Sequence, residues 1–510
     1  IVGAGPTGLF LALVLSRLGI RVRIIDETGA PGTTSRALAM QARTLEFYRQ
    51  LDIADDVVRR ALRLDTVNLW RRGVHAAQVE LGAIGQGLSP FPFALIFPQD
   101  EHESLLIEKL LALGVTVERR TTLIGLEERP QSVVVREQSG DGAIATCEAN
   151  YVAGCDGARS LIRRTIGAEF PGGTYEHLFY VADVQARGAR MNHELHVMLD
   201  EAGFLALFPL LGEGRGRLIG TVRADAVGES ELRWEHIDRR PLERIGLEIE
   251  QVHWFSTYRV HHRVADRFRR GRVFLLGDAA HIHSPVGGQG MNTGLGDAMN
   301  LAWKLAAVLD DRANSDLLDS YEPERIAFAR RLVQTTDRVF QAASSESRVA
   351  KVVRTGLVPA VVSRVFRTSL GRRFFFRMLS QTGIEYRSSA WSGGEALGAV
   401  RAGDRLPWVE PARPDQPDNF TPLRSLDWQV HVYGTPSLDL RSRCSVHQLP
   451  LHAFAFDAHA KAAELHDDAV YLVRPDGYLG AVFPASTATG ELEEYLAAHG
   501  VRTRSANPAG

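Results

Sequence analysis

Three glycines at the start of the chain have the spacing of a phosphate-binding turn. Gly3, Gly5 and Gly8 form a G-x-G-x-x-G motif that precedes a nearly wholly apolar run, residues 9–18, which predicts a buried helix. In such a turn the first glycine permits the tight bend, the second lets a pyrophosphate approach the backbone, and the third lets the helix lie close to the sheet. The N–H groups at the helix start favour the negative charge of a phosphate. The motif predicts dinucleotide binding, and the alternative is a glycine turn that only packs.

An acidic residue stands where a dinucleotide-binding unit needs one. Gly19 is placed as a helix stop, and a second apolar run, residues 22–25, ends in Asp26. A carboxylate at the end of the second strand can accept hydrogen bonds from a ribose. The order of these elements, a strand, a glycine turn, a helix and a second strand that ends in an acid, therefore predicts a dinucleotide-binding site.

Two later motifs also follow predicted strands. Asp156-Gly157 ends the apolar stretch 151–155, and Gly277-Asp278 ends the apolar stretch 272–276. A glycine-rich loop, residues 285–292, follows the second motif, and a helix is predicted from about Thr293 onwards. A carboxylate at a strand end can hold a sugar-alcohol hydroxyl, and the alternative for Asp278 is a cap for the next helix.

In their order and spacing, these three motifs resemble those of the class A flavoprotein monooxygenases, the family of p-hydroxybenzoate and phenol hydroxylases. The resemblance covers about residues 1–340. It implies FAD as the cofactor, NADPH or NADH as a transient hydride donor, and O₂ as a co-substrate. It also implies hydroxylation of a phenolic or polycyclic aromatic ring through a C4a-hydroperoxyflavin. No second glycine fingerprint occurs in the sequence, so a separate nicotinamide-binding domain is not expected.

The resemblance also assigns residues to the cofactor. Asp278 is expected to hold the ribityl chain, and the segment 290–292 is expected to present backbone N–H groups to the pyrimidine edge of the flavin. Arg36 matches an arginine near the pyrophosphate, and Gln99 matches a glutamine that contacts FAD. Arg43 is either a second cofactor residue or a solvated helix arginine. The expected cofactor-binding residues are Gly3, Gly5, Gly8, Asp26, Arg36, Arg43, Gln99, Asp156, Gly277, Asp278, Gly290, Met291 and Asn292.

Two residues beside the glycine-rich loop are candidates for the reaction itself. Pro285 stands where the family places a backbone carbonyl near the substrate hydroxyl. His283 departs from the more apolar residue common at its position and is expected to face the flavin or the substrate. With His281 it forms a His-x-His pattern, but no third ligand is nearby, so packed or hydrogen-bonded histidines are the better interpretation and no metal is predicted.

The expected fold is α/β, with a Rossmann-like FAD-binding domain formed by residues 1–178 and 260–345. Residues 179–259 alternate as strands do and predict an antiparallel sheet that roofs the flavin, which residues 62–98 partly join to form a mixed-sheet substrate domain. The candidates for the substrate pocket, for which ordinary sheet core is the alternative, are His196, Phe208, Trp254 and Tyr258.

The last third of the chain predicts a helical bridge and a further domain. Residues 346–394 contain a basic, aromatic run that could lie on an anionic membrane surface or, as the alternative, pack on the core and offer a solvated or subunit face. Residues 395–510 resemble the thioredoxin-like domain of phenol hydroxylases and polyketide aromatic hydroxylases. They contain no Cys-x-x-Cys, and Cys444 stands alone, so a structural or homodimer-supporting role is expected instead of dithiol chemistry.

Composition excludes several other classes of protein. The 59 basic residues nearly balance the 61 acidic ones, which argues against binding to nucleic acid through bulk charge. Only three cysteines occur, and no apolar run reaches the length that crosses a bilayer, so we expect a cytoplasmic protein. The chain begins with Ile1 inside a strand pattern, so we expect residues to precede it. The alternatives that the motifs leave open are Baeyer–Villiger or epoxidation chemistry and a non-catalytic flavin-binding protein; the expected substrate is a small aromatic or polyketide-like molecule.

Overall fold

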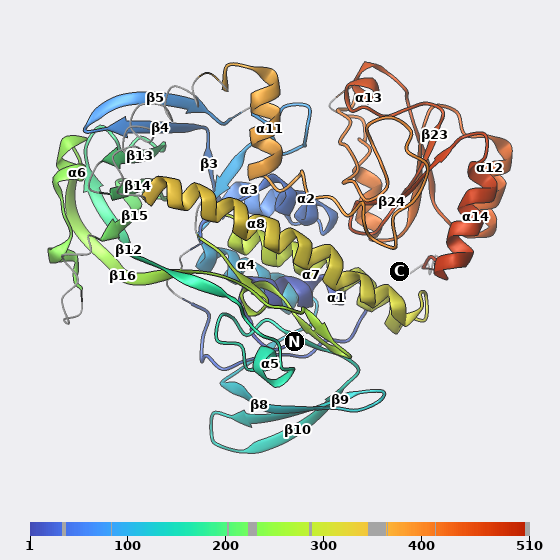
Figure 1. Cartoon of the computed structure of the whole chain (residues 1–510), viewed down its shortest axis with the longest axis horizontal. Coiled ribbons are helices and arrows are strands. Elements are labelled where there is room, and N and C mark those ends of the chain that lie inside the picture. The colour runs from blue at the N-terminus through green and yellow to red at the C-terminus, as the bar shows by residue number, and fades with distance from the viewer. Residues whose placement is uncertain are drawn as a thin grey trace.

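The computed structural model describes residues 1–32, 37–82, 84–200, 203–222, 232–284, 288–344, 364, 366–413 and 415–504. Figure 1 shows three packed parts: an α/β centre, a large curved sheet at one end, and a smaller α/β domain at the other. The long helix α8 (Tyr321–Ser344) crosses the centre of the molecule in this view.

A parallel sheet forms the base of the central part. Val2 bridges both Ile25 and Gly154, and so joins the parallel pairs β1–β7 and β11–β18 into one sheet, which β17 continues in antiparallel fashion. The helices α1 and α7 pack on each other, and α4 packs on α1. The bounds are Ile24–Asp26 for β1, Val117–Arg119 for β7, Val152–Gly154 for β11, Arg269–Arg270 for β17, Val273–Leu275 for β18, Pro6–Arg17 for α1, Gln99–Ala112 for α4 and Gly290–Leu309 for α7.

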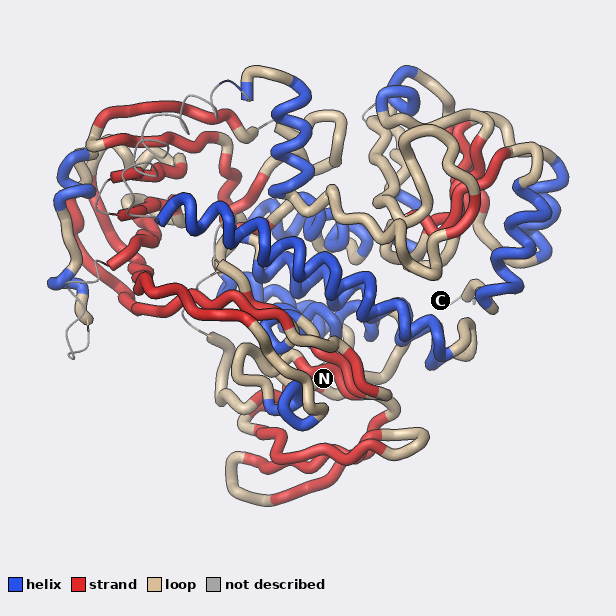
Figure 2. The backbone as a smooth tube through the Cα atoms, viewed as in Figure 1, coloured by secondary structure: helices blue, strands red, loops and turns tan. Residues whose placement is uncertain are grey.

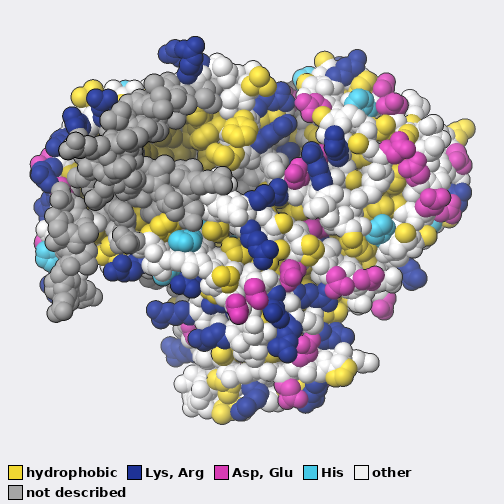
Figure 3. Space-filling model, viewed as in Figure 1, with side chains coloured by type: hydrophobic (Ala, Val, Ile, Leu, Met, Phe, Trp, Pro, Cys, Tyr) yellow, Lys and Arg dark blue, Asp and Glu magenta, His cyan; other side chains and the backbone are white. Residues whose placement is uncertain are grey.

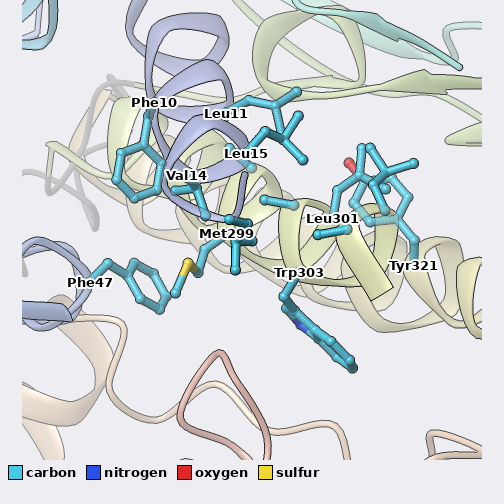
Figure 4. Packing of buried hydrophobic residues seen from close by; sticks show 14 of the residues in the cluster. Phe10, Leu11, Val14, Leu15, Phe47, Met299, Leu301, Trp303 and Tyr321 are labelled. Carbon is cyan, nitrogen blue, oxygen red and sulfur yellow. The ribbon is translucent and has the colours of Figure 1, made fainter. Parts of the chain in front are cut away.

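The helix α1 is apolar on all sides because its neighbours cover all sides. Its residues from Gly8 to Leu15 are all buried, which explains the continuous apolar run in the sequence. The helix ends at Arg17, and Gly19, with a φ of 78°, turns the chain towards β1. Figure 4 shows how the labelled side chains of α1 lie beside those of α7 and its neighbours: Phe10, Leu11, Val14, Leu15, Phe47, Met299, Leu301, Trp303 and Tyr321.

The large sheet has eight strands among the described residues, in the order β19-β16-β12-β15-β14-β13-β4-β5. Its neighbours pair in antiparallel fashion except β13 and β4, which are parallel, so the sheet is mixed, as the sequence predicted. Residues 62–98 contribute β4 and β5. The bounds are Thr66–Arg71 for β4, Val74–Glu80 for β5, Gly172–Arg187 for β12, Leu195–Asp200 for β13, Gly203–Pro209 for β14, Arg215–Val222 for β15, Glu248–Val264 for β16 and His281–Ile282 for β19.

The two faces of this sheet pack against different partners. One face, which includes Leu207 and Leu218, packs on the short helix α6 (Arg240–Arg244) and its flanks. The other face, called the inner face below, includes Ala206 and Phe208 and packs on Leu38 and other residues of the central part. Since side chains alternate along a strand, each position in the sheet is committed to one of these two environments.

Smaller elements complete the central part. The strands β2, β6 and β3 form a sheet of their own, and β8, β9 and β10 form a hairpin sheet that projects at the bottom of Figure 1. The bounds are Ala39–Met40 for β2, Leu62–Leu64 for β3, Ala94–Ile96 for β6, Thr121–Glu128 for β8, Val133–Ser139 for β9, Ile144–Ala149 for β10, Ala42–Gln50 for α2, Ala54–Arg60 for α3 and Leu161–Thr165 for α5.

The described part of the predicted helical bridge contains α11 (Ser369–Leu379), and most of residues 346–365 lie outside the described residues. Phe375 and Phe376 pack with the core on the inner face of the large sheet, whereas Leu370 and Phe374 are exposed. Figure 3 shows hydrophobic side chains gathered around a hollow on the face that carries α11. Among the described residues, no helix has both the length and the apolar character to cross a membrane.

The C-terminal domain has a central sheet with helices around it, as the strand and helix colours of Figure 2 show. The strand order is β20-β24-β23-β21-β22; β21 and β22 are parallel, and β23 and β24 form an antiparallel hairpin through the turn at Pro475-Asp476-Gly477. The bounds are Gly393–Gly394 for β20, Gln429–Tyr433 for β21, Leu451–Phe454 for β22, Ala469–Val473 for β23, Leu479–Pro484 for β24, Leu438–Val446 for α12, Ala458–Ala462 for α13 and Ala488–His499 for α14.

A buried ionic network joins this hairpin turn to the central part. Arg474 donates two hydrogen bonds to the Glu324 carboxylate of α8, at 2.9 and 3.0 Å, and it also bonds Asp476. Lys304 of α7 donates to Glu324 at 2.8 Å. Trp303 and Arg43 donate to the Asp476 side chain and backbone carbonyl. Burial alone would raise the pKa of Glu324, but Arg474 and Lys304 outweigh it and hold that pKa far below its usual range.

Candidate functional site

The glycine turn is tightly packed at two glycines and open at the third. A Cβ on Gly3, whose φ is 101°, would lie 2.2 Å from the Cys155 carbonyl oxygen, and one on Gly8 would lie 2.0 Å from the Gly3 carbonyl oxygen. A Cβ on Gly5 would meet no described atom within 4 Å. The turn therefore needs two glycines for packing and keeps the third for open space above the start of α1.

Asp26 holds this turn from the end of β1. Its Oδ2 accepts a hydrogen bond from the Ala4 N–H at 2.7 Å, and its Oδ1 accepts from the backbone and side chain of Thr28. Arg119, its neighbour on β7, has one nitrogen 3.4 Å from Oδ1. The second terminal nitrogen of Arg119 is buried and has no partner among the described residues.

The Asp156-Gly157 motif lies against the first turn. A Cβ on Gly3 would lie 3.0 Å from the Asp156 backbone nitrogen. The Asp156 Oδ2 accepts from the Ile162 N–H at 3.1 Å at the start of α5, while its Oδ1 is buried without a partner in the described part of the chain. Gly157, with a φ of 74°, has open space where a side chain would stand.

The Gly277-Asp278 motif meets the first turn through Thr7. A Cβ on Gly277, whose φ is 56°, would lie 2.7 Å from the Thr7 hydroxyl, and one on Gly294 of α7 would lie 2.3 Å from it. Asp278 is exposed in the 3-10 turn, Gly277–Ala279, that follows β18. All three motifs and the start of α7 thus lie around the N-terminus of α1.

A buried carboxylate fixes the third motif. Asp297 of α7 accepts from the Gly277 N–H at 3.0 Å, lies 2.7 Å from the His281 Nε2, and accepts from Arg325 at 2.6 Å. Burial raises the pKa of Asp297, but attractions to Arg325 and His281 outweigh it and lower that pKa below its usual value. His281 is therefore the hydrogen-bonded histidine that the sequence favoured. No sequence signal paired Arg325 or Thr7 with these motifs.

The start of α7 carries the predicted backbone donors. Helix α7 begins at Gly290, so Gly290, Met291 and Asn292 form its first turn instead of preceding it, and their N–H groups have no acceptors within the helix. The Asn292 side chain accepts from the Gln41 N–H at 2.9 Å and donates to the Ala39 carbonyl. The segment after residue 36 is thereby tied to the helix start.

Three predicted arginine and glutamine positions have different outcomes. Arg36 lies outside the described residues. Gln99 begins α4 and donates to Glu103 at 2.8 Å, while its N–H donates to the Ala37 carbonyl. Arg43 is buried, ion-paired with Glu46 and bonded to the C-terminal hairpin turn. It is neither solvated nor directed to the three motifs, and this corrects the expectation of a cofactor role for it.

The large sheet places three of the four pocket candidates on its inner face. Phe208, Arg217, Asp183 and Trp254 lie directly opposite one another across β14, β15, β12 and β16. Tyr258 is four residues further along β16 on the same face.

His196 lies on the other face, opposite Leu207, and is therefore separated from the other three candidates. There it accepts from the Trp70 indole N–H at 3.1 Å and lies 2.9 Å from the Asn192 side-chain oxygen. The error has a physical cause: inward and outward positions differ by one residue in register, and the sequence does not show the register.

An ion pair interrupts the aromatic row on the inner face. Arg217 donates to both carboxylate oxygens of Asp183, at 2.6 and 2.7 Å, and its side chain is only 3% exposed. Its guanidinium lies 5.8 Å from the centre of the Trp254 ring. The inner face therefore combines aromatic rings with a buried bidentate charge pair, and a mainly apolar surface with a few fixed polar groups is typical of small-molecule sites.

His283 follows β19 and lies beside the start of α7. Its Nδ1 is 2.8 Å from the Ser284 carbonyl oxygen, and its Nε2 is 3.7 Å from where a Cβ on Gly290 would stand. Both the His283 Nε2 and the Ser284 hydroxyl are buried without a partner in the described part of the chain. Burial lowers the pKa of His283 to about 4. Pro285 lies outside the described residues.

The geometry fits an extended dinucleotide with a flavin at one end. The open space at Gly5 and Gly157 suits a pyrophosphate, and the first-turn N–H groups of α7 suit the anionic edge of a reduced flavin. The unpartnered atoms of Arg119, Asp156 and His283 are polar groups that a bound ligand would satisfy. No group of three or more potential metal ligands occurs in the described residues.

Buried neutral histidines predict a loss of stability in acid. Burial lowers the pKa of both His196 and His283 from 6.5 to about 4. In the unfolded chain they take up protons near pH 6.5, so the stability they contribute is present above that pH and is lost as pH falls towards 4. We expect the urea-unfolding free energy to fall over this range, by up to about 1.4 kcal/mol per pH unit for each histidine.

The matched control is the exposed His459. His196→Gln should flatten the pH dependence, and His459→Gln should leave it unchanged. An unfolding free energy that stays constant or rises between pH 6.5 and 4.5 would contradict this expectation.

Comparison with known proteins agrees with the geometry. The model of the FAD binding domain family matches residues 1–336. The 6-methylpretetramide 4-monooxygenase of Streptomyces rimosus is 31% identical over 504 residues, covering 94% of this chain and 90% of the relative. A flavin-dependent monooxygenase of Mycobacteroides abscessus is 30% identical and covers 98% of both chains.

Among solved structures, the anhydrotetracycline hydroxylase of Streptomyces rimosus has a TM-score of 0.78 and 26% identity, and the match covers 99% of each chain. The match spans the central part, the large sheet and the C-terminal domain together. The chain belongs to the family of FAD-dependent aromatic monooxygenases.

Proposed function

We propose that the chain hydroxylates the phenolic ring of a polycyclic, polyketide-like substrate, with NADPH or NADH as hydride donor and O₂ as co-substrate. The observation that carries the proposal is the convergence of three motifs on the α1 N-terminus, in the central part on which the inner face of the large sheet packs, together with the aromatic side chains that this face carries. The relatives support the substrate class, since two of them are named for anhydrotetracycline.

When bound, FAD accepts hydride and activates dioxygen for transfer to the substrate ring. The residues of the chain would bind FAD and position it. Gly5 and Gly157 leave room for the pyrophosphate, Asp156 and Asp278 bind ribose or ribityl hydroxyls, and the first turn of α7 stabilises negative charge on the pyrimidine edge. Arg36, Gln99 and Pro285 remain part of the proposed site through the family resemblance.

The substrate would lie between this flavin position and the inner face of the large sheet. Phe208, Trp254 and Tyr258 supply aromatic surface, and the Asp183–Arg217 pair supplies the polar contact. An apolar chamber excludes water, which protects an activated oxygen species from wasteful decay.

We assign the C-terminal domain to the thioredoxin-like class. The order β24-β23-β21-β22, with β21 and β22 parallel around α12 and a closing hairpin before α14, supports this assignment. Burial raises the pKa of the Cys444 thiol to about 11, and no Cys-x-x-Cys is present, so its role is structural.

The test is a panel of single-ring phenols and two- to four-ring hydroxylated aromatics. We expect the polycyclic phenols to accelerate NADPH oxidation by the holoenzyme at least about tenfold, as effectors that engage the site should, and to yield products heavier by one oxygen atom. The control is each compound with free FAD. NADPH oxidation that no aromatic compound accelerates, or that yields only hydrogen peroxide, would contradict the proposal.

A further inference from the structure

Only one tautomer of the neutral His283 ring is compatible with the hydrogen bond that the ring makes. A carbonyl oxygen only accepts hydrogen bonds, so the contact between the His283 Nδ1 and the Ser284 carbonyl places the ring proton on Nδ1. The Nε2 of the neutral ring then carries a lone pair and no proton. Burial favours this neutral form. Nε2 therefore accepts a hydrogen bond and cannot donate one.

This acceptor is buried and has no hydrogen-bond donor among the described residues. In the described residues around it, Nε2 has no hydrogen-bond partner, and neither has the adjacent Ser284 hydroxyl. A buried polar atom left without a partner costs free energy, so such atoms are rare unless a ligand or water completes them. The position indicates a ligand that brings an O–H or N–H donor.

The position of His283 in the fold indicates which ligand group donates to its Nε2. His283 follows β19, which pairs with β16 at Val264 and Arg263 on the edge of the large sheet. Its Nε2 points to the neighbourhood of Gly290, the first residue of α7. His283 therefore lies where the edge of the substrate-binding sheet meets the proposed flavin position. A hydroxyl on the ring to be oxidised would lie at this boundary.

We propose that the His283 Nε2 accepts a hydrogen bond from the phenolic hydroxyl of the substrate, and so selects ring hydroxyls over their ethers and orients the ring towards the flavin. This inference rests on the proposed function and names a specificity-determining residue of the same site. It treats the departure of His283 from the family's usual apolar residue as functional.

The test uses a matched pair of probes that differ only in the donor: 2-naphthol, which has an O–H, and 2-methoxynaphthalene, which has none. Binding to the oxidised holoenzyme is measured by equilibrium dialysis, without NADPH. We expect wild type to bind 2-naphthol roughly 3- to 10-fold more tightly than the ether, as one additional buried hydrogen bond would. In His283→Leu this ratio should fall to about 1, whereas His283→Gln, whose amide oxygen can accept, should restore part of it.

Three further measurements separate this role from other ones. The thermal stability of His283→Leu without ligand should stay close to that of wild type, because the variant loses the Nδ1 bond to the Ser284 carbonyl but also removes the unpaired, buried Nε2; a histidine that only supports the fold would show a loss of stability with an unaltered naphthol ratio. The affinity for FAD should be unchanged; a weaker affinity with an unaltered naphthol ratio would assign Nε2 to a flavin N–H and overturn the proposal. His459→Leu, at an exposed histidine, should leave every value unchanged.

The outcomes also distinguish this inference from the proposed function. A ratio near 1 in wild type, an equal ratio in His283→Leu, or no binding of either probe overturns the role of His283. If the holoenzyme still hydroxylates phenols in that case, the proposed function stands alone. If no phenol accelerates NADPH oxidation but the ratio depends on His283, the phenol-binding role stands and the proposed reaction fails.

Discussion

Gly5→Ala should weaken FAD binding strongly while leaving the fold intact. The φ and ψ of Gly5, −75° and −177°, are open to alanine, and the new Cβ would meet no described atom within 4 Å. The space that it would fill is where the second glycine of the motif admits the pyrophosphate. We expect the affinity for FAD to fall by about 10- to 100-fold, as the steric cost of one methyl group against a closely packed partner implies. Flavin fluorescence measures the affinity, and thermal unfolding of the apoprotein measures the fold.

Two controls make this expectation sharp. Gly490→Ala changes another glycine with open space around it, in α14 of the C-terminal domain; it should leave the FAD affinity unchanged and, because alanine favours a helix over glycine, should not destabilise the apoprotein. Gly8→Ala places a Cβ 2.0 Å from the Gly3 carbonyl oxygen and should destabilise the apoprotein itself. If Gly5→Ala binds FAD as tightly as wild type, the phosphates do not lie at this turn.

Removing the Arg474 side chain should cost more stability than removing any exposed arginine. Arg474→Leu would leave the carboxylates of Glu324 and Asp476, both about 1% exposed, without their main cation. Breaking a buried ion pair from one side typically costs about 3–5 kcal/mol, because the remaining charge is desolvated and uncompensated. We expect a loss of that size in the free energy of unfolding, measured with urea.

The comparison is Arg187→Leu, which breaks an ion pair with Glu250 in which the arginine side chain is 78% exposed. Exposed pairs contribute about 0–1 kcal/mol, so this variant should be close to wild type. Glu324→Gln should also unfold more easily, because Lys304 and Arg474 would lose their shared partner. Equal stabilities for Arg474→Leu and Arg187→Leu would show that the junction does not contribute.

The sequence predicted those features that depend on local pattern. The apolar run after Gly8 indicated a buried helix, and α1 is buried along that run. The order of the three motifs predicted a common site, because strand ends of a parallel sheet meet at one edge. The alternation between residues 179 and 259 indicated the strands of the large sheet.

Features that depend on contacts between distant residues could not be predicted. Arg43 belongs to a helix next to the site, yet its side chain bonds a turn 433 residues away in sequence. His196 and Phe208 were both predicted to face the substrate, but the register of the strands places them on opposite faces of the sheet. The start of α7 was placed three residues late, because glycine and asparagine are poor helix formers and this first turn is held by tertiary hydrogen bonds of Asn292.

The link between Arg474 and Glu324 has a consequence for biosynthesis. The two residues are 150 positions apart, so a ribosome has made the whole central part well before it makes the arginine. Of the two described cations that bond Glu324, Lys304 alone is present during that interval. We therefore expect chains that stop short of residue 474 to lack this contact between the two parts, and to be preferred substrates for proteolysis.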